Sequence, residues 1–188
     1  MLPPYQVGGL ASHDAQSLLL AFQNEASADR FGCEVSLDFS KAFDYVDWEL
    51  AHMLLTRAGL PANVLGPIKN MWEDQTRWFS YGGAISPNPL KNCRAILQGD
   101  PWGPLALAVL VSAPFRKLKH DLGDNLHQIC FMDDRSAVMT TGDTFQQYLR
   151  EWSVFEHHTR LKTNPAKTQY WARNSAAAVA RLRLRLTT

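Results

Sequence analysis

The sequence CFMDDRSAV, residues 130–138, sets two adjacent carboxylates, Asp133 and Asp134, between two apolar runs. Both runs have the composition of β-strands, and aspartates tolerate the backbone angles of tight turns. The stretch therefore predicts a hairpin with the acids near its tip. Turn chemistry alone is an adequate explanation of adjacent aspartates, so the pair by itself assigns no function.

A third carboxylate lies far from the pair in the sequence but in a related setting. In CEVSLDF, residues 33–39, Val35, Leu37 and Phe39 alternate with polar residues, which predicts a strand with Asp38 on the face opposite the apolar set. Neighbouring strands lie only about 5 Å apart, so Asp38 and the acid pair can meet. Clustered carboxylates repel one another unless cations lie among them, and Mg²⁺ joins carboxylates to waters and phosphates. The pattern favours a magnesium site suited to phosphoryl transfer.

The remaining elements intermix without the strict alternation of a parallel doubly wound sheet. Helices are expected over residues 13–32, from a cap at Asp47 to Gly59, over 64–72, over 101–123 and from a cap at Asp143 to Phe155, with short strands around Gly82 and Gly83 and over 164–172. This order predicts an α+β fold, in which an antiparallel sheet has helices packed on one face.

Composition limits the class of protein. The 188 residues suit one domain, and 46% hydrophobic with 20% charged residues excludes a disordered chain. Three widely spaced cysteines, Cys33, Cys93 and Cys130, indicate neither a disulfide framework nor a zinc site. The longest apolar stretch, about residues 102–115, is shorter than the roughly 18–20 residues of a membrane span, so we expect no membrane association and an intracellular location, cytoplasmic or nuclear. The net charge of +1 falls short of that of a self-sufficient nucleic-acid binder.

Four ordered stretches carry a family resemblance. They are LDFSKAFDYVDW (37–48), ILQGDPWGPL (96–105), FMDD (131–134) and LKTNPAKTQ (161–169). Together they resemble the palm motifs of reverse transcriptases, and especially those of LINE-type (non-LTR) retrotransposons, over about residues 6–170. The resemblance implies a polymerase palm-like fold with partial fingers and a thumb that is largely absent.

The resemblance also implies roles for particular residues. Asp38 and Asp133 are the expected ligands of Mg²⁺, with Mn²⁺ as the alternative ion, and Asp134 is the neighbouring carboxylate of the same metal site. Lys167 matches a lysine that acts as general acid or charge partner for the leaving pyrophosphate. A solvated surface lysine remains the alternative interpretation of Lys167.

Further residues match the segment that contacts the incoming deoxynucleoside triphosphate. Phe43 matches a bulky ring that lies against the sugar and favours deoxynucleotides, although composition alone makes it a core residue. Gly99 allows close backbone approach, although residues 99–101 also suit an ordinary turn into a helix. The expected nucleotide-binding residues are Phe39, Phe43, Gln98, Gly99 and Met132.

The sequence departs from the family pattern in several places. Leu10 and Ala11 stand where phenylalanine and arginine are expected, and Gly103 replaces a serine. We expect residues 1–32 to be a partial fingers remnant, 33–171 the palm and 172–188 a C-terminal tail, whose RLRLRL run suits a solvated terminus. The chain is thus expected to be a truncated retrotransposon product, with further domains in a parent polyprotein.

Three hypotheses follow. The first is an RNA-directed DNA polymerase palm that uses two metal ions to join a primer 3′-hydroxyl to a deoxynucleoside triphosphate, with an RNA template and a DNA primer as partners. The second is a catalytically inactive fragment that acts as a nucleic-acid or protein binding module. The third, of the same chemistry, is a reverse transcriptase similar to group II intron maturases.

Overall fold

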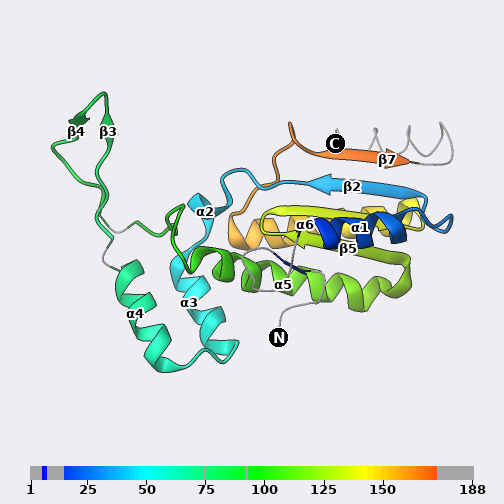
Figure 1. Ribbon diagram of the computed structural model, residues 1–188, viewed down its shortest axis with the longest axis horizontal. Helices are drawn as coiled ribbons and strands as arrows, with labels where there is room; N and C mark the ends of the chain where they lie inside the picture. The colour runs from blue at the N-terminus through cyan, green and yellow to red at the C-terminus, as the bar shows by residue number, and fades with distance from the viewer. Residues whose placement is uncertain (1–5, 8–14, 74, 92, 173–188) are drawn as a thin grey trace.

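The computed structural model describes residues 6–7, 15–73, 75–91 and 93–172, and the fold is built around a five-stranded sheet in the order β1-β5-β6-β2-β7 (Figure 1). The strands are β1 (Gln6–Val7), β2 (Cys33–Leu37), β5 (Leu126–Phe131), β6 (Asp134–Met139) and β7 (Gln169–Ala172). The short β1 pairs parallel with β5, and the other neighbours pair antiparallel. The expected α+β fold with an antiparallel palm-like sheet is confirmed.

Helices cover both faces of this sheet. The long helices α5 (Gly103–Leu122) and α6 (Gly142–Thr159) pack on one face, where Leu126 and Cys130 of β5 join the main core. Helix α1 (Ala15–Ala26) lies on the other face, where Phe22 packs with Ile129 of β5. The two layers expected from the sequence are therefore present, and α1 adds a third.

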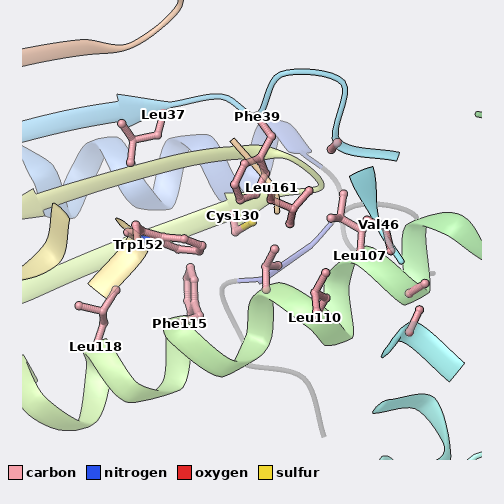
Figure 2. Close-up of a cluster of buried hydrophobic side chains, with 14 of the residues drawn as sticks. Leu37, Phe39, Val46, Leu107, Leu110, Phe115, Leu118, Cys130, Trp152 and Leu161 are labelled. Atoms are coloured by element: carbon pink, nitrogen blue, oxygen red, sulfur yellow. The ribbon is translucent and has the colours of Figure 1, made fainter. Parts of the chain in front are cut away.

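The main core lies between the sheet and the helices α5 and α6. In Figure 2, Leu37, Phe39 and Leu161 point toward Phe115 of α5 and Trp152 of α6. The indole of Trp152 contacts the rings of Phe39, Tyr148 and Phe155 edge-on, with centroids 6.2, 6.2 and 5.6 Å away. Such aromatic pairs each contribute about 0.5–1.5 kcal/mol beyond their burial. This packing fixes the ends of β2 and β6, where the acids lie.

Three helices lie beyond the end of β2. They are α2 (Ala42–Tyr45), α3 (Trp48–Arg57) and α4 (Ala62–Glu73). The carboxylate of Asp47 accepts hydrogen bonds from the backbone N–H groups of Glu49 and Leu50, at 2.9 and 3.4 Å. Gly59 follows α3 with a φ of 87°, which favours glycine. The predicted cap and stop of α3 are confirmed.

A two-stranded hairpin extends away from the sheet (Figure 1). It consists of β3 (Ser80–Tyr81) and β4 (Ala84–Ile85), joined by Gly82 and Gly83. Both glycines have positive φ, 57° and 83°, as a type I′ turn requires. The strands predicted around these glycines are confirmed.

Two predicted helix boundaries are wrong. Helix α1 ends at Ala26, six residues before Gly32, where the hydroxyl of Ser27 donates a 2.7 Å hydrogen bond to the carbonyl of Asn24 and competes with the helix. Helix α6 is capped by Thr141 instead of Asp143. Thr141 and Thr144 form a reciprocal capping box of 3.3 and 3.1 Å, which satisfies two backbone donors at once.

Among the described residues, no helix is long and apolar enough to cross a membrane. The departures at Leu10 and Ala11 and the RLRLRL run of the predicted tail lie outside those residues. The division into a fingers remnant, a palm and a tail stays a prediction.

Candidate active site

The sheet brings the three aspartates to one end of adjacent strands. Strand β2 pairs antiparallel with β6 so that Leu37 lies opposite Arg135, and at this end of the ladder Asp38 follows Leu37 while Asp134 precedes Arg135. Asp133 lies in the turn between β5 and β6. The strand register therefore puts Asp38 and the acid pair at the same end of the sheet, and their joint binding of a metal stays a prediction.

A two-residue turn carries the acid pair. Phe131 and Asp134 form the last pair of the β5–β6 ladder, so Met132 and Asp133 alone make the turn. Met132 has a φ of 55°, a left-handed conformation that costs a non-glycine residue about 1–2 kcal/mol. The thiol of Cys130 donates a 3.2 Å hydrogen bond to the Met132 carbonyl, and burial raises the pKa of this thiol to about 12, so it keeps its proton. The buried thiol therefore stabilises the turn through its hydrogen bond to the Met132 carbonyl.

Asp38 is nearly enclosed and faces a lysine. Its residue is 7% exposed, and the ammonium Nζ of Lys167 lies 2.7 Å from its carboxylate Oδ2. Contact with Asp38, followed by its charge, raises the pKa of Lys167, so the lysine is cationic at neutral pH. Within the described chain, no hydrogen bond of regular geometry reaches this Oδ2. A buried carboxylate oxygen here has a cation as a close neighbour.

Asp134 is exposed, yet the charges of Asp38 and Lys167 both act on its pKa. Partial burial is the main cause that raises its pKa, and the charges of Asp133 and Asp38 raise it further. Lys167 and Arg135 oppose this shift. The protonation of Asp134 therefore depends on two other carboxylates and two cations nearby.

The carboxylates at this end of the sheet would hold Mg²⁺ only together with other ligands. In the part of the chain that the structure describes, no group of three or more His, Cys, Asp or Glu side chains is arranged to hold a metal ion. Mg²⁺ commonly uses only one or two protein carboxylates and completes its shell with waters and substrate phosphates. The Asp38 oxygen, which lacks a regular hydrogen bond, and the neighbouring negative charges that help to raise the pKa of Asp134 both fit residues that would hold a cation.

Residues 161–168, here called the Lys167 segment, are docked against the chain around Asp38. The Ser40 N–H donates to the Lys162 carbonyl and the Asn164 N–H donates to the Asp38 carbonyl, both at 2.8 Å. A turn follows, in which the Lys167 N–H donates to the Asn164 carbonyl at 3.2 Å. These bonds carry Lys167 to the carboxylate of Asp38, so the lysine joins the acids in space.

The segment containing Gln98 and Gly99 forms the turn into α5. Gly99 has a φ of 90° and open space around it, and Gln98 is exposed. The carboxylate of Asp100 accepts hydrogen bonds from the Trp72 indole N–H and from the Trp102 backbone N–H, both at 2.7 Å. The turn interpretation is confirmed, and nucleotide contacts of Gln98 and Gly99 stay a prediction.

The two phenylalanines predicted to contact the nucleotide lie in different settings. Phe39 is 2% exposed and its ring is part of the main core, so a nucleotide contact through this ring does not fit the structure. Phe43 of α2 is half-buried beside Gly103, where a Cβ would lie 3.2 Å from its Cε1 atom. The serine that the family pattern expects at position 103 would therefore press on the Phe43 ring.

Arg135, which is fully buried next to Asp134, is a residue of this site that was not predicted from the sequence. Its burial could have been predicted from strand alternation, because Arg135 lies on the same face of β6 as the core residues Ala137 and Met139. Charged residues are almost never fully buried, so the phase alone did not identify it.

An antiparallel sheet with aspartates at the ends of adjacent strands, backed by α5 and α6, has the architecture of the class of polymerase palm domains. The family profile described as reverse transcriptase (RNA-dependent DNA polymerase) matches residues 13–178. The chain belongs to the reverse transcriptase family. The resemblance found in the four sequence stretches is confirmed at this level.

Solved structures agree on the fold. Telomerase from Candida tropicalis, in complex with a fragment of telomeric RNA, is similar with a TM-score of 0.69 at 11% identity, over 92% of this chain and 31% of that one. An apo form truncated from its C-terminal domain gives 0.69 at 13% identity, over 92% and 37% of the two chains. Telomerase from Candida albicans gives 0.59 at 11% identity, over 92% and 32%. The chain thus spans about a third of these telomerases, and a comparison with curated proteins found no match.

Proposed function

We propose that this chain is the catalytic palm of an RNA-directed DNA polymerase that extends a primer 3′-hydroxyl with deoxynucleoside triphosphates on an RNA template. One observation carries the proposal: Asp38, Asp133 and Asp134 lie at one end of the sheet, and the Lys167 ammonium lies 2.7 Å from Asp38. Membership of the reverse transcriptase family supports it.

Asp38 and Asp133 would hold Mg²⁺ or Mn²⁺, with Asp134 beside them. When bound, two such ions supply positive charge to the attacking and leaving oxygens of an in-line phosphoryl transfer. Asp38 is held for this task because β2 and the Lys167 segment enclose it on two sides. Asp133 is presented from the tip of a hairpin whose turn is supported by Cys130.

Lys167 serves the departing pyrophosphate. Its side chain is 67% exposed, so it can move from Asp38 toward a phosphate while its backbone stays docked. Its raised pKa keeps the ammonium protonated at neutral pH, as a proton donor or positive charge requires.

The incoming nucleotide would lie between the acids and the turn before α5. Gly99 leaves its backbone open to close approach, and Gln98 is exposed beside it. The Phe43 ring, held against Gly103, would face the sugar and disfavour a 2′-hydroxyl. Met132 would contact the nucleotide from the hairpin turn.

The order and residue pattern of the four motifs favour a LINE-type origin. With such an origin the protein would act inside the cell. Further domains of a parent polyprotein would then supply additional contacts to template and primer. The net charge of +1 supports this dependence on other parts, because phosphate contacts need many Lys and Arg side chains. Group II intron maturase-like enzymes share the same chemistry and are the nearest rival origin.

Primer extension on an RNA template tests the proposal. Asp38→Asn and Asp133→Asn should each lower the rate by about 10²-fold or more, because each removes an anionic oxygen that would hold a metal ion at the reacting centre. Asp143→Asn, an exposed aspartate of α6, is the matched control and should leave the rate unchanged. Equal product from the unmodified chain and Asp133→Asn would refute the proposal.

The inactive-fragment hypothesis predicts a different result. Binding of Mg²⁺ or Mn²⁺ without measurable affinity for a primer–template duplex would favour the inactive fragment over the polymerase. Metal titration and duplex binding against salt therefore separate the two hypotheses.

A further inference from the structure

A cation is buried in the main core directly behind the acids. Arg135 follows Asp134 in β6 and is 0% exposed. Its guanidinium carbon lies 3.6 Å from the centroid of the Phe39 ring and 4.2 Å from that of Trp152. The charged group is thus enclosed between aromatic rings from β2's end and from α6.

The polar contacts of Arg135 are few and involve Thr163 and Glu156. Nη2 donates a 2.9 Å hydrogen bond to the hydroxyl of Thr163, and Nη1 lies 3.7 Å from the Glu156 carboxylate. The Thr163 hydroxyl in turn donates to the same Glu156 oxygen. Within the described chain, the Nε and Nη1 atoms have no hydrogen-bond partner. Within the described chain, the side-chain hydrogen bond of Arg135 is therefore the one to Thr163.

This arrangement is a costly way to fill a core. Burial lowers the pKa of Arg135, although a guanidinium stays charged in proteins. Replacing such a buried ion by an apolar side chain of similar volume is often neutral or stabilising. Stability alone therefore does not account for a cation at this position.

Thr163 occupies a central place in the Lys167 segment. It lies between Lys162 and Asn164, whose backbone groups bond to Ser40 and Asp38, and it forms a β-bridge with Phe39. The guanidinium of Arg135 holds the Thr163 side chain in the middle of these bonds. Lys167 lies only four residues further along.

We propose that Arg135 is a positioning residue that fixes the Lys167 segment against Asp38 and so sets the place of the Lys167 ammonium. The positioning is a property of the fold, whereas its effect on nucleotide addition rests on the proposed function. Arg135 does not touch substrate, since it is completely enclosed.

Amide hydrogen exchange measured residue by residue by NMR tests the positioning directly. In Arg135→Met, the amides of Ser40 and Asn164 should exchange about tenfold faster, which corresponds to the loss of one charge-assisted hydrogen bond, while β5 and β6 amides keep their protection. Arg135→Lys, which keeps the charge, should give a smaller increase. Arg150→Met, an exposed arginine of α6, is the matched control and should change neither amide.

Thr163→Val provides a second variant that leaves Arg135 in place. It removes the hydroxyl with little change of shape, and should speed exchange at Ser40 and Asn164 in the same way. This variant decides the question where Arg135→Met fails to fold. Unchanged exchange at both amides, or a uniform loss of protection over the whole sheet, would overturn the proposal.

Kinetics test the link to Lys167. Lys167→Met should lower kcat in the unmodified chain, but by at most about twofold in the Arg135→Met background, because the lysine is then already misplaced. Equal fold-losses in both backgrounds would show that Arg135 acts only on general stability. A chain that extends no primer refutes the proposed function alone, and the exchange experiment still decides the positioning.

Discussion

The sheet body and the β3–β4 hairpin use similar aromatic residues in opposite ways. In the body, Tyr148 and Trp152 are 0% and 1% exposed. In the hairpin region, Phe79 and Tyr81 are 67% and 92% exposed. Burial of apolar surface stabilises folding only where it occurs, so the aromatic residues of the body hold the acids in place and those of the hairpin add little. The sheet body is therefore the part of the chain that is stabilised by a core, whereas the hairpin exposes apolar surface to solvent.

The largest test of this contrast is Trp152→Ala. The change opens a cavity beside Phe39 and Arg135 and should lower the free energy of unfolding by about 3–5 kcal/mol. Urea denaturation followed by circular dichroism measures it. A loss below about 1 kcal/mol would mean that the core relaxes around the gap and that the body is less rigid than its packing indicates.

A second test concerns the end of the sheet that carries the aspartates, where the charged form of Asp134 lowers the stability of the fold. The pKa of Asp134 is raised, so between the ordinary aspartate value and the raised one the folded chain binds more protons than the unfolded chain, and stability falls as pH rises through this window. Asp134→Asn should therefore raise the midpoint of thermal unfolding at neutral pH by a small amount, with no gain below the ordinary aspartate pKa. The Asp143→Asn variant is the control, and a lower midpoint for Asp134→Asn at neutral pH would contradict the prediction.

The smallest expected effect lies in the hairpin. Tyr81→Ala removes a side chain that is almost fully exposed and should change the free energy of unfolding by no more than about 0.5 kcal/mol. Denaturation under the same conditions as Trp152→Ala gives the comparison. A loss of 2 kcal/mol or more, on the order of a core substitution, would show that the hairpin is part of the folded core.

Much of this fold follows from local patterns in the sequence. The alternation around Asp38 predicted β2, and Asp47 with Gly59 predicted both ends of α3. The motif order identified the family and named the acids that the sheet brings together. These features were predictable because each depends on neighbours close in the sequence or on spacing that the chemistry requires.

Other features depend on choices that only tertiary packing makes. Thr141 and Asp143 are both good helix caps, and geometry alone decides between them. The apolar runs of β5 and β6 suit a strand buried on both faces, a pattern that indicates cover on each side but not that α1 supplies it. The burial of Arg135 follows from contacts with Trp152, Glu156 and Thr163, which come from elements that sequence spacing does not connect.

The sheet order has a consequence for how the chain folds as it is synthesised. Strand β2 lies between β6 and β7, so Val35 must wait for Ala137 and Tyr170 before either edge is paired. Until then the strand has open edges and an apolar face on the nascent chain. Such distant pairings slow folding and prolong the exposure of the open edges of β2 to aggregation while the chain is being synthesised.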